Sequence, residues 1–247
     1  MKLKSILVSQ PEPESKKNPY FGLAEKHKVK VDFRPFIHVE SVNPQEFRQE
    51  KIRILDHTAI ILTSRNAVDH FFNMAKELRV SIPDSMKYFC MSEAIAFYLQ
   101  KYVVYRKRKI FHGQQRFQDL MPLIKKHKKE KFLLPCSSIH KLEIPKLLEE
   151  NKIDYSKAVF YKTVASDLSD LAKINYDMLV FFSPSGIESL LKNFPDFKQN
   201  ETKIAVFGPT TAKAAEESGL RIDVHAPTQN APSMTMAIEQ YMKNGKK

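Results

Sequence analysis

The chain carries one strand–turn–helix sequence twice, and this repeat constrains its fold more than any other feature. The first copy is Ile60–Val68 (IILTSRNAV) and the second is Val180–Ile187 (VFFSPSGI), with Ser64 aligned to Ser183 at an offset of 119. Each copy has an apolar run typical of a buried strand, a hydroxyl-rich turn and then helical periodicity. Such a turn leaves free backbone N–H groups at the helix start, which suit an anion. The repeat therefore predicts two related domains with one such turn each.

A second unit is duplicated as well, because Met91–Ala96 aligns with Phe207–Ala212 at an offset of 116. Apolar runs alternate with helical patterns along the whole chain, which is typical of a parallel α/β sheet. We expect strands at 4–8, 29–34, 57–62, 87–91, 102–105, 131–135, 157–163, 177–182, 203–207 and 222–225. We expect helices at 17–27, 66–78, 93–101, 116–127, 140–150, 184–193, 210–218 and 231–243.

The two copies are permuted relative to each other. Ser5–Ser9 with the strand Val29–Phe33 resembles Lys131–Cys136 with the strand Lys157–Phe160, so the start of the chain completes the C-terminal copy. We predict an α/β fold of two related parallel-sheet domains joined by a two-stranded linker, with the chain crossing between domains twice. The expected ranges are 1–36 with 165–247 for one domain, 42–157 for the other, and 37–41 with 158–164 for a hinge-like ribbon.

Composition excludes several classes of protein. No apolar run reaches membrane-spanning length, and the N-terminus is typical of a first strand rather than a signal peptide, so we expect a cytoplasmic protein without a membrane partner. The 6 glycines are scattered and form neither a P-loop nor a dinucleotide fingerprint. The 8 histidines make no ligand pattern, and Cys136-x3-His140 alone is weak. We therefore expect no metal and no cofactor.

Positive charge is concentrated in one segment. The net charge is +12, and residues 101–131 hold 11 Lys or Arg against Asp119 and Glu130, which gives 11 − 2 = +9 for this tract. A basic tract can bind nucleic acid, but a solvated surface is the commoner explanation. No stacked aromatic and basic repeat accompanies this tract, so we expect no nucleic-acid partner.

Hydroxyl and amide side chains gather at the predicted strand-to-helix turns. They are Ser64, Asn66, Ser183, Ser185, Thr210 and Thr211. In open α/β sheets these turns meet at the carboxyl edge of the strands, where ligands bind. Each residue can instead be a simple helix cap. A cap needs only one hydroxyl, however, and two of the turns have two hydroxyls each, Ser183 with Ser185 and Thr210 with Thr211. Tyr161, at the second crossing, is a further candidate, with a half-buried ribbon tyrosine as the alternative. We predict that these hydroxyls face one cleft between the domains.

An ordered set of motifs resembles the uroporphyrinogen-III synthase family. The motifs are Phe181–Ile187 (FFSPSGI), Val206–Ala214 (VFGPTTAKA), Phe160–Thr163 (FYKT) and Ala226–Thr228 (APT). Their order and spacing agree with the family over essentially the whole chain, and the family has the two-domain, double-crossing fold inferred above. The turn Ser9–Pro11 departs from the family, which often has a Thr-Arg-Pro-like sequence there.

The resemblance implies a cofactor-independent lyase, expected to be a monomer, that acts on hydroxymethylbilane, a linear tetrapyrrole with acetate and propionate groups on every ring. The enzyme removes the terminal hydroxyl as water and closes the ring with the last pyrrole inverted, in tetrapyrrole (heme) biosynthesis. Tyr161 is the family-matched candidate to assist the leaving hydroxyl. The candidate substrate-binding residues are Ser64, Arg65, Asn66, Ser183, Ser185, Gly186, Pro209, Thr210, Thr211 and Lys213. The alternative is a hinged two-domain protein that binds a polyanionic ligand without catalysis.

Overall fold

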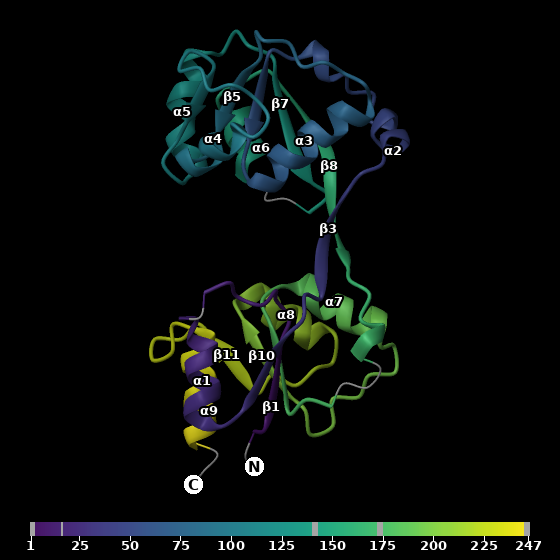
Figure 1. Ribbon diagram of the computed structural model, residues 1–247, viewed down its shortest axis with the longest axis vertical. Helices are drawn as coiled ribbons and strands as arrows, with labels where there is room; N and C mark the ends of the chain where they lie inside the picture. The colour runs from purple at the N-terminus through teal and green to yellow at the C-terminus, as the bar shows by residue number, and fades with distance from the viewer. Residues whose placement is uncertain (1–2, 16, 140–142, 172–174, 245–247) are drawn as a thin grey trace. The chain divides into compact units, whose positions relative to one another are not determined.

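The chain is organised as two compact units (Figure 1). The computed structural model describes residues 3–15, 17–139, 143–171 and 175–244. Unit 1 consists of Met1–His38 and Val164–Lys247, and unit 2 is the continuous segment Val39–Thr163. The chain therefore passes from one unit to the other twice.

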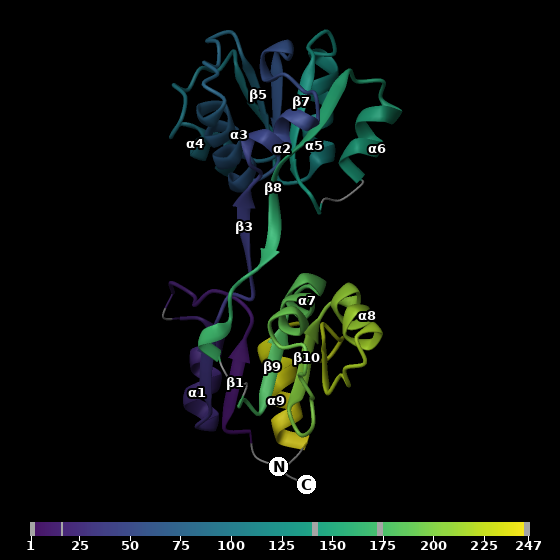
Figure 2. The ribbon, with the colours of Figure 1, turned by 90° about the vertical axis from the view of Figure 1, so that its right-hand side faces the viewer.

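Unit 1 contains a five-stranded, wholly parallel sheet in the order β11-β10-β9-β1-β2. Figure 2 shows its strands β10, β9 and β1 side by side. Its strands are β1 (Ser5–Val8), β2 (Lys30–Phe33), β9 (Met178–Phe181), β10 (Lys203–Phe207) and β11 (Val224–Ala226). The N-terminal strand β1 lies between β2 and β9, with Ile6 opposite Met178. Residues from the start of the chain thus complete a sheet whose other strands come mostly from its last third.

Helices cover both faces of this sheet. They are α1 (Pro19–His27), α7 (Pro184–Asn193), α8 (Pro209–Glu217) and α9 (Met234–Asn244). Ile6 and Val8 pack with residues of α1 and α9, whereas Leu7 between them packs with residues of α7 and α8. Successive strand side chains point to opposite faces, so a fully apolar strand is stable only when both faces are covered. This is the physical reason for the continuous apolar run in β1.

Unit 2 repeats the same layering around a six-stranded sheet in the order β3-β8-β7-β4-β5-β6. The strands are β3 (Ile37–Ser41), β4 (Ala59–Leu62), β5 (Lys87–Cys90), β6 (Ile110–His112), β7 (Phe132–Ser137) and β8 (Tyr155–Ala165). Residues of α2 (Pro44–Gln49), α3 (Arg65–Glu77) and α4 (Glu93–Leu99) pack on one face. Residues of α5 (Phe117–Lys126) and α6 (Glu143–Glu150) pack on the other. Two 3₁₀ turns, Ile54–Asp56 in unit 2 and Ser169–Leu171 in unit 1, complete the elements.

The strands β3 and β8 form the ribbon through which the chain crosses. Val42 N donates to Phe160 O, and Ser166 N donates to Phe36 O, each over 3.0 Å or less. Residue numbers rise along one strand as they fall along the other, so the pair is antiparallel. The strand pairs β4–β5, β4–β7, β5–β6 and β7–β8 of this sheet are parallel. The predicted fold class is therefore confirmed.

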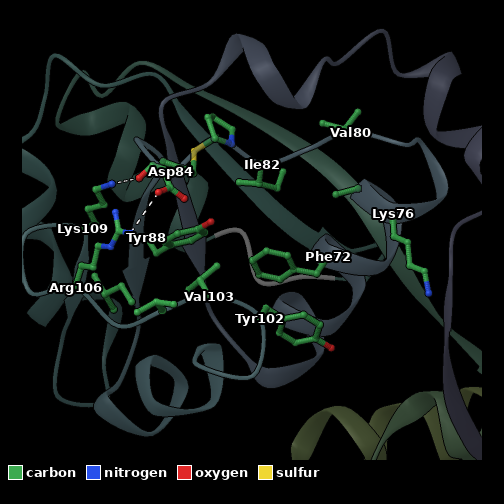
Figure 3. Close-up of a pocket in the computed structure, with 15 residues that line it drawn as sticks. Phe72, Lys76, Val80, Ile82, Asp84, Tyr88, Tyr102, Val103, Arg106 and Lys109 are labelled. Carbon is green, nitrogen blue, oxygen red and sulfur yellow. Dashed lines mark hydrogen bonds and ion pairs between the residues drawn. The ribbon is translucent and has the colours of Figure 1, made fainter.

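The predicted strand at 102–105 is wrong. The edge strand is β6, where Ile110 lies opposite Tyr88 of β5. Tyr102, Val103 and Val104 instead line a hollow of about 440 Å³ beside Phe72 and Tyr88. Figure 3 shows Tyr102 and Val103 with Phe72 and Tyr88 around it. Val104 is 78% exposed, so this apolar run belongs to a surface loop rather than to a sheet.

Helix α2 was not predicted, although Asn43 and Pro44 before it are a recognisable start signal. The Asn43 side chain accepts a hydrogen bond from Glu46 N over 2.8 Å, and Pro44 occupies the first helical position. The first residues of the predicted helix 140–150 lie outside the described residues, and α6 is described from Glu143. Within the described ranges, no helix is long and apolar enough to cross a bilayer.

Candidate active site

The two repeated turns have the same local structure in both units. Ser64 precedes α3 with φ −157° and ψ 167°, and Ser183 precedes α7 with φ −153° and ψ 153°. The Ser64 hydroxyl accepts from Ala67 N over 3.0 Å, and the Ser183 hydroxyl accepts from Gly186 N over 3.3 Å. Both serines are therefore helix caps, and the other N–H groups of each helix start remain directed toward the turn.

In unit 1 the predicted residues lie at neighbouring strand ends. Ser183, Ser185 and Gly186 follow β9, and Pro209 begins α8 immediately after β10, which pairs with β9 in parallel. Parallel neighbours end at the same edge of a sheet, so both turns share the carboxyl edge. A Cβ on Gly186 would lie 3.4 Å from the Phe181 ring, which is an ordinary contact. Glycine is therefore not required there by packing within unit 1.

Thr211 is unusual among these residues, because its hydroxyl is buried without a partner. The residue is 1% exposed, and Oγ1 makes no hydrogen bond within the described part of the chain. It is not the helix cap, since that position belongs to Gly208, whose φ of 85° lies in the region that favours glycine. The first copy of the repeat has the apolar Ile95 at this place. Buried hydroxyls normally have partners, so Thr211 is suited to a ligand contact.

Unit 2 contains a cavity of about 880 Å³ at the carboxyl edge of its sheet. Its lining includes Thr63 and Ser64 after β4, Met91 after β5, and Cys136 at the end of β7. Tyr161 from β8 completes this side of the lining. The volume is in the ordinary range for small-molecule sites. Of the residues predicted from the sequence, the cavity brings together Ser64 and Tyr161.

The phenol of Tyr161 is held among polar and aromatic neighbours. Its Oη lies 3.5 Å from Ser64 Oγ, at the limit of a hydrogen bond, and the residue is 8% exposed. Burial raises the pKa of Tyr161 above its usual value, so the phenol is protonated at neutral pH. The nearby Cys136 thiol donates to Ala158 O, and burial raises the pKa of this thiol to about 11. Both groups are therefore neutral proton donors.

The acidic residues that line the cavity are already hydrogen-bonded. Asp119 accepts from the backbone N–H groups of Arg116 and Gln115 at 3.0 and 3.2 Å, and the Arg116 N–H is the main cause that lowers the pKa of Asp119. Glu143 accepts from Gln118 Nε2 over 2.5 Å. Arg116 also lines the cavity, and a guanidinium there suits a carboxylate ligand.

Five predicted residues lie on exposed surface. Arg65 packs over the Tyr98 ring at 5.3 Å, and Lys213 pairs with Glu217 at 3.7 Å one helical turn away. Asn66 and Thr210 are exposed near the starts of α3 and α8. Pro209 is also exposed and serves as the first residue of α8. The prediction that the hydroxyls of both units face one cleft stays a prediction.

Comparison with known proteins identifies the family. A family model described as uroporphyrinogen-III synthase HemD matches residues 19–236, which is most of the chain. The chain belongs to the uroporphyrinogen-III synthase family. It is similar to the uroporphyrinogen-III synthase of Chlorobaculum parvum, with 23% identity over 98% of this chain and 100% of that protein. It is also 28% identical to that of Saccharomyces cerevisiae over 142 residues, 51% of each chain, so the match spans about half the length of the yeast relative.

Solved uroporphyrinogen-III synthases have the same fold. The structure from Helicobacter pylori covers 98% of this chain and 100% of its own, with a TM-score of 0.58 and 18% identity. A mutant structure from Thermus thermophilus covers 98% and 99%, with a TM-score of 0.51 and 16% identity. The family is one of cofactor-independent cyclising lyases in tetrapyrrole biosynthesis. None of these relatives is named as a non-catalytic binding protein, so nothing supports the alternative of a hinged two-domain protein that binds a polyanionic ligand without catalysis.

Two residues at or beside the candidate site were not predicted from the sequence. Arg116 lies in the basic tract, which we interpreted as solvated surface, and no spacing rule separates it from its neighbours. His70 stacks on Tyr161, with ring centroids 5.0 Å apart and an interplanar angle of 20°. A lone histidine on a helix gives no sequence signal for this contact. Among the described residues, no group of three or more His, Cys, Asp or Glu could hold a metal ion, and His140 lies outside them.

Proposed function

We propose that this chain converts hydroxymethylbilane to uroporphyrinogen III, with loss of water and inversion of the last pyrrole ring. One observation carries the proposal. In a chain of this family, the buried and protonated Tyr161 phenol lines an 880 Å³ cavity beside the helix-capping Ser64. This is the arrangement that a reaction with a departing hydroxyl requires, because it places a neutral proton donor at a carboxyl-edge pocket.

The leaving step needs only modest help from the protein. A pyrrole nitrogen lone pair expels the terminal hydroxyl and leaves an azafulvene cation, while the hydroxyl takes up a proton and departs as water. Tyr161 is proposed to donate a hydrogen bond or proton to this oxygen. A phenol is a weak acid, and burial makes it weaker, so its contribution is expected at the lower end of general-acid effects.

The second task is to hold a flexible polycarboxylate in the shape that permits ring inversion. We propose that helix-start N–H groups and hydroxyls bind its acetate and propionate groups. In unit 2 the candidates are Ser64 and Arg116, which line the cavity. In unit 1 they are the turns at Ser183, Ser185 and Gly186 and at Pro209, Thr210 and Thr211, with Lys213 one turn further along α8. Arg65 and Asn66 remain candidates at the exposed start of α3.

We infer a cytoplasmic monomer. Cys90 and Cys136 are buried free thiols, as expected in a reducing compartment. Each unit buries both faces of its own sheet, so neither needs a second chain to cover a core.

The test is an assay with freshly made hydroxymethylbilane that separates the III isomer from the I isomer formed spontaneously. The wild-type chain is expected to give the III isomer. Tyr161→Phe keeps the ring and removes the hydroxyl, so we expect a loss of about 10²-fold in kcat with retained folding by circular dichroism. A folded Tyr161→Phe variant at full rate would remove Tyr161 from the mechanism, and a wild-type chain that gives only the I isomer would refute the function.

A further inference from the structure

The Tyr161 ring packs against the imidazole of His70, which in turn lies within hydrogen-bond distance of Ser41. His70, on α3, stacks on Tyr161 with centroids 5.0 Å apart and a 20° interplanar angle. The His70 Nδ1 lies 2.7 Å from Ser41 Oγ at the end of β3, within hydrogen-bond distance, and either atom can donate. Ser41, His70 and Tyr161 thus form a chain of contacts from β3 through α3 to β8, all within unit 2.

We propose that His70 is a positioning residue that fixes the Tyr161 phenol beside Ser64 at the reacting end of the cavity. The inference rests on the proposed function of Tyr161 and adds to it a residue that holds the phenol in place. His70 does not line the cavity, so it acts through Tyr161 rather than on the substrate.

The contact is suited to this role because the imidazole limits the movement of the Tyr161 side chain on one face of its ring. The phenol oxygen of a tyrosine moves only when the whole ring swings about χ1, and a flat ring packed against its face blocks that swing. A side chain that is itself hydrogen-bonded makes a firmer support than a free one. Burial lowers the pKa of His70, with the nearby Asp69 acting in the opposite direction, so the imidazole is neutral at pH 7 and packs as an aromatic ring.

The first experiment is a double-mutant cycle measured as III-isomer formation. His70→Ala is expected to lower kcat about 3- to 10-fold, because the correctly placed population of Tyr161 falls, while KM changes less than about twofold. In a Tyr161→Phe background the same change is expected to have no further effect, since the hydroxyl that His70 positions is already absent. His70→Phe restores a flat ring and is expected to recover the rate to within about twofold. Ser41→Ala should have a smaller effect in the same direction as His70→Ala.

The matched control is Asn73→Ala, an exposed position one turn further along α3, which should keep wild-type kcat. A purely structural role for His70 would lower activity equally with and without the Tyr161 hydroxyl, and that additive result would overturn the inference. So would a failure of His70→Phe to improve on His70→Ala.

A second measurement does not depend on activity. The ring NMR resonances of Tyr161, assigned by their loss in Tyr161→Phe, are expected to shift in His70→Ala and to stay unchanged in Asn73→Ala. Unchanged Tyr161 resonances in His70→Ala would overturn the inference by themselves. If the wild-type chain formed only the I isomer, the proposed function would fall, and these resonances would still decide whether His70 packs on the Tyr161 ring.

Discussion

At the scale of single residues, the hydroxyls at the strand ends divide into two kinds. Ser64 and Ser183 cap helices, so their presence follows from local backbone chemistry. Thr211 caps nothing, because Gly208 has that position, and its Oγ1 is buried without a hydrogen bond in the described structure. An unpaired buried hydroxyl costs stability, and Thr211 is the predicted binding residue of unit 1 with such a hydroxyl; its contact with a ligand stays a prediction.

The Thr211→Val substitution tests separately how the hydroxyl affects folding stability and how it affects substrate binding. Valine has the shape of threonine without the hydroxyl, so the free energy of unfolding is expected to stay unchanged or to rise by up to about 1 kcal/mol. If a substrate carboxylate or backbone group uses the hydroxyl, KM is expected to rise about 5- to 100-fold, equivalent to about 1–3 kcal/mol. Urea unfolding and steady-state kinetics measure the two effects. Unchanged KM would show that the hydroxyl has no ligand. The control is Glu216→Gln, at an exposed position further along the same helix, which should keep the wild-type KM.

At the scale of elements, the first and last helices of unit 1 are joined by one acidic residue. Glu239 on α9 pairs with Lys26 on α1 at 2.6 Å and with Lys243 of its own helix at 3.1 Å. The hydrogen bond from Lys26 is the main cause that lowers the pKa of Glu239 from 4.5 to about 2. A carboxyl group with a lowered pKa in the folded state stabilises that state when ionised.

The sign of the pH effect follows from these two pKa values. The contribution of Glu239 is fully present above its unfolded pKa of 4.5 and is lost as the pH falls toward the folded value of about 2. Glu239→Gln is therefore expected to lower the thermal midpoint at pH 7, with a difference from wild type that shrinks as the pH falls through this window. Salt should reduce the difference, because the pair is exposed. A difference that stays constant with pH would contradict this, and Glu25→Gln on α1 is the control.

At the scale of the whole molecule, the two units differ in how the chain builds them. Unit 2 is one continuous segment, whereas unit 1 needs both ends of the chain. In unit 1, β1 separates β2 from β9, so removing residues 1–38 would uncover one edge of β9 and the apolar residues packed against Ile6, Leu7 and Val8. The two units are therefore expected to differ in their ability to fold as separate fragments.

We expect residues 39–163 to fold alone and residues 164–247 to fail to do so. The first fragment keeps every pairing from β8 to β6 and both helix layers, so it should unfold cooperatively with native-like circular dichroism. The second fragment lacks two of the five strands of its sheet. A single chain that joins residues 1–38 to 164–247 through a short linker should restore cooperative unfolding. Cooperative unfolding of 164–247 alone would contradict this account of unit 1.

The sequence by itself determined the elements that depend on local chemistry and on the repeat. The apolar strands β4 and β9, the caps Ser64 and Ser183, and the parallel α/β class all follow from patterns within a few residues, because burial on both faces requires continuous apolar strands. The permuted repeat also indicated that β1 joins the C-terminal sheet, since only that pairing completes the second copy. Asn43 and Pro44 are also a local helix-start signal, although α2 was not among the predicted helices.

Only the tertiary structure decided the features that depend on contacts between distant residues. The run Tyr102–Tyr105 has strand-like composition, yet Ile110–His112 takes the place beside β5, because edge pairing depends on which segment reaches the strand. The stacking of His70 on Tyr161 joins residues 91 positions apart, since 161 − 70 = 91, and the unpaired hydroxyl of Thr211 depends on packing around α8. Local patterns contain no information about such neighbours, so the stacking of His70 on Tyr161 and the unpaired state of the Thr211 hydroxyl became visible only in the folded chain.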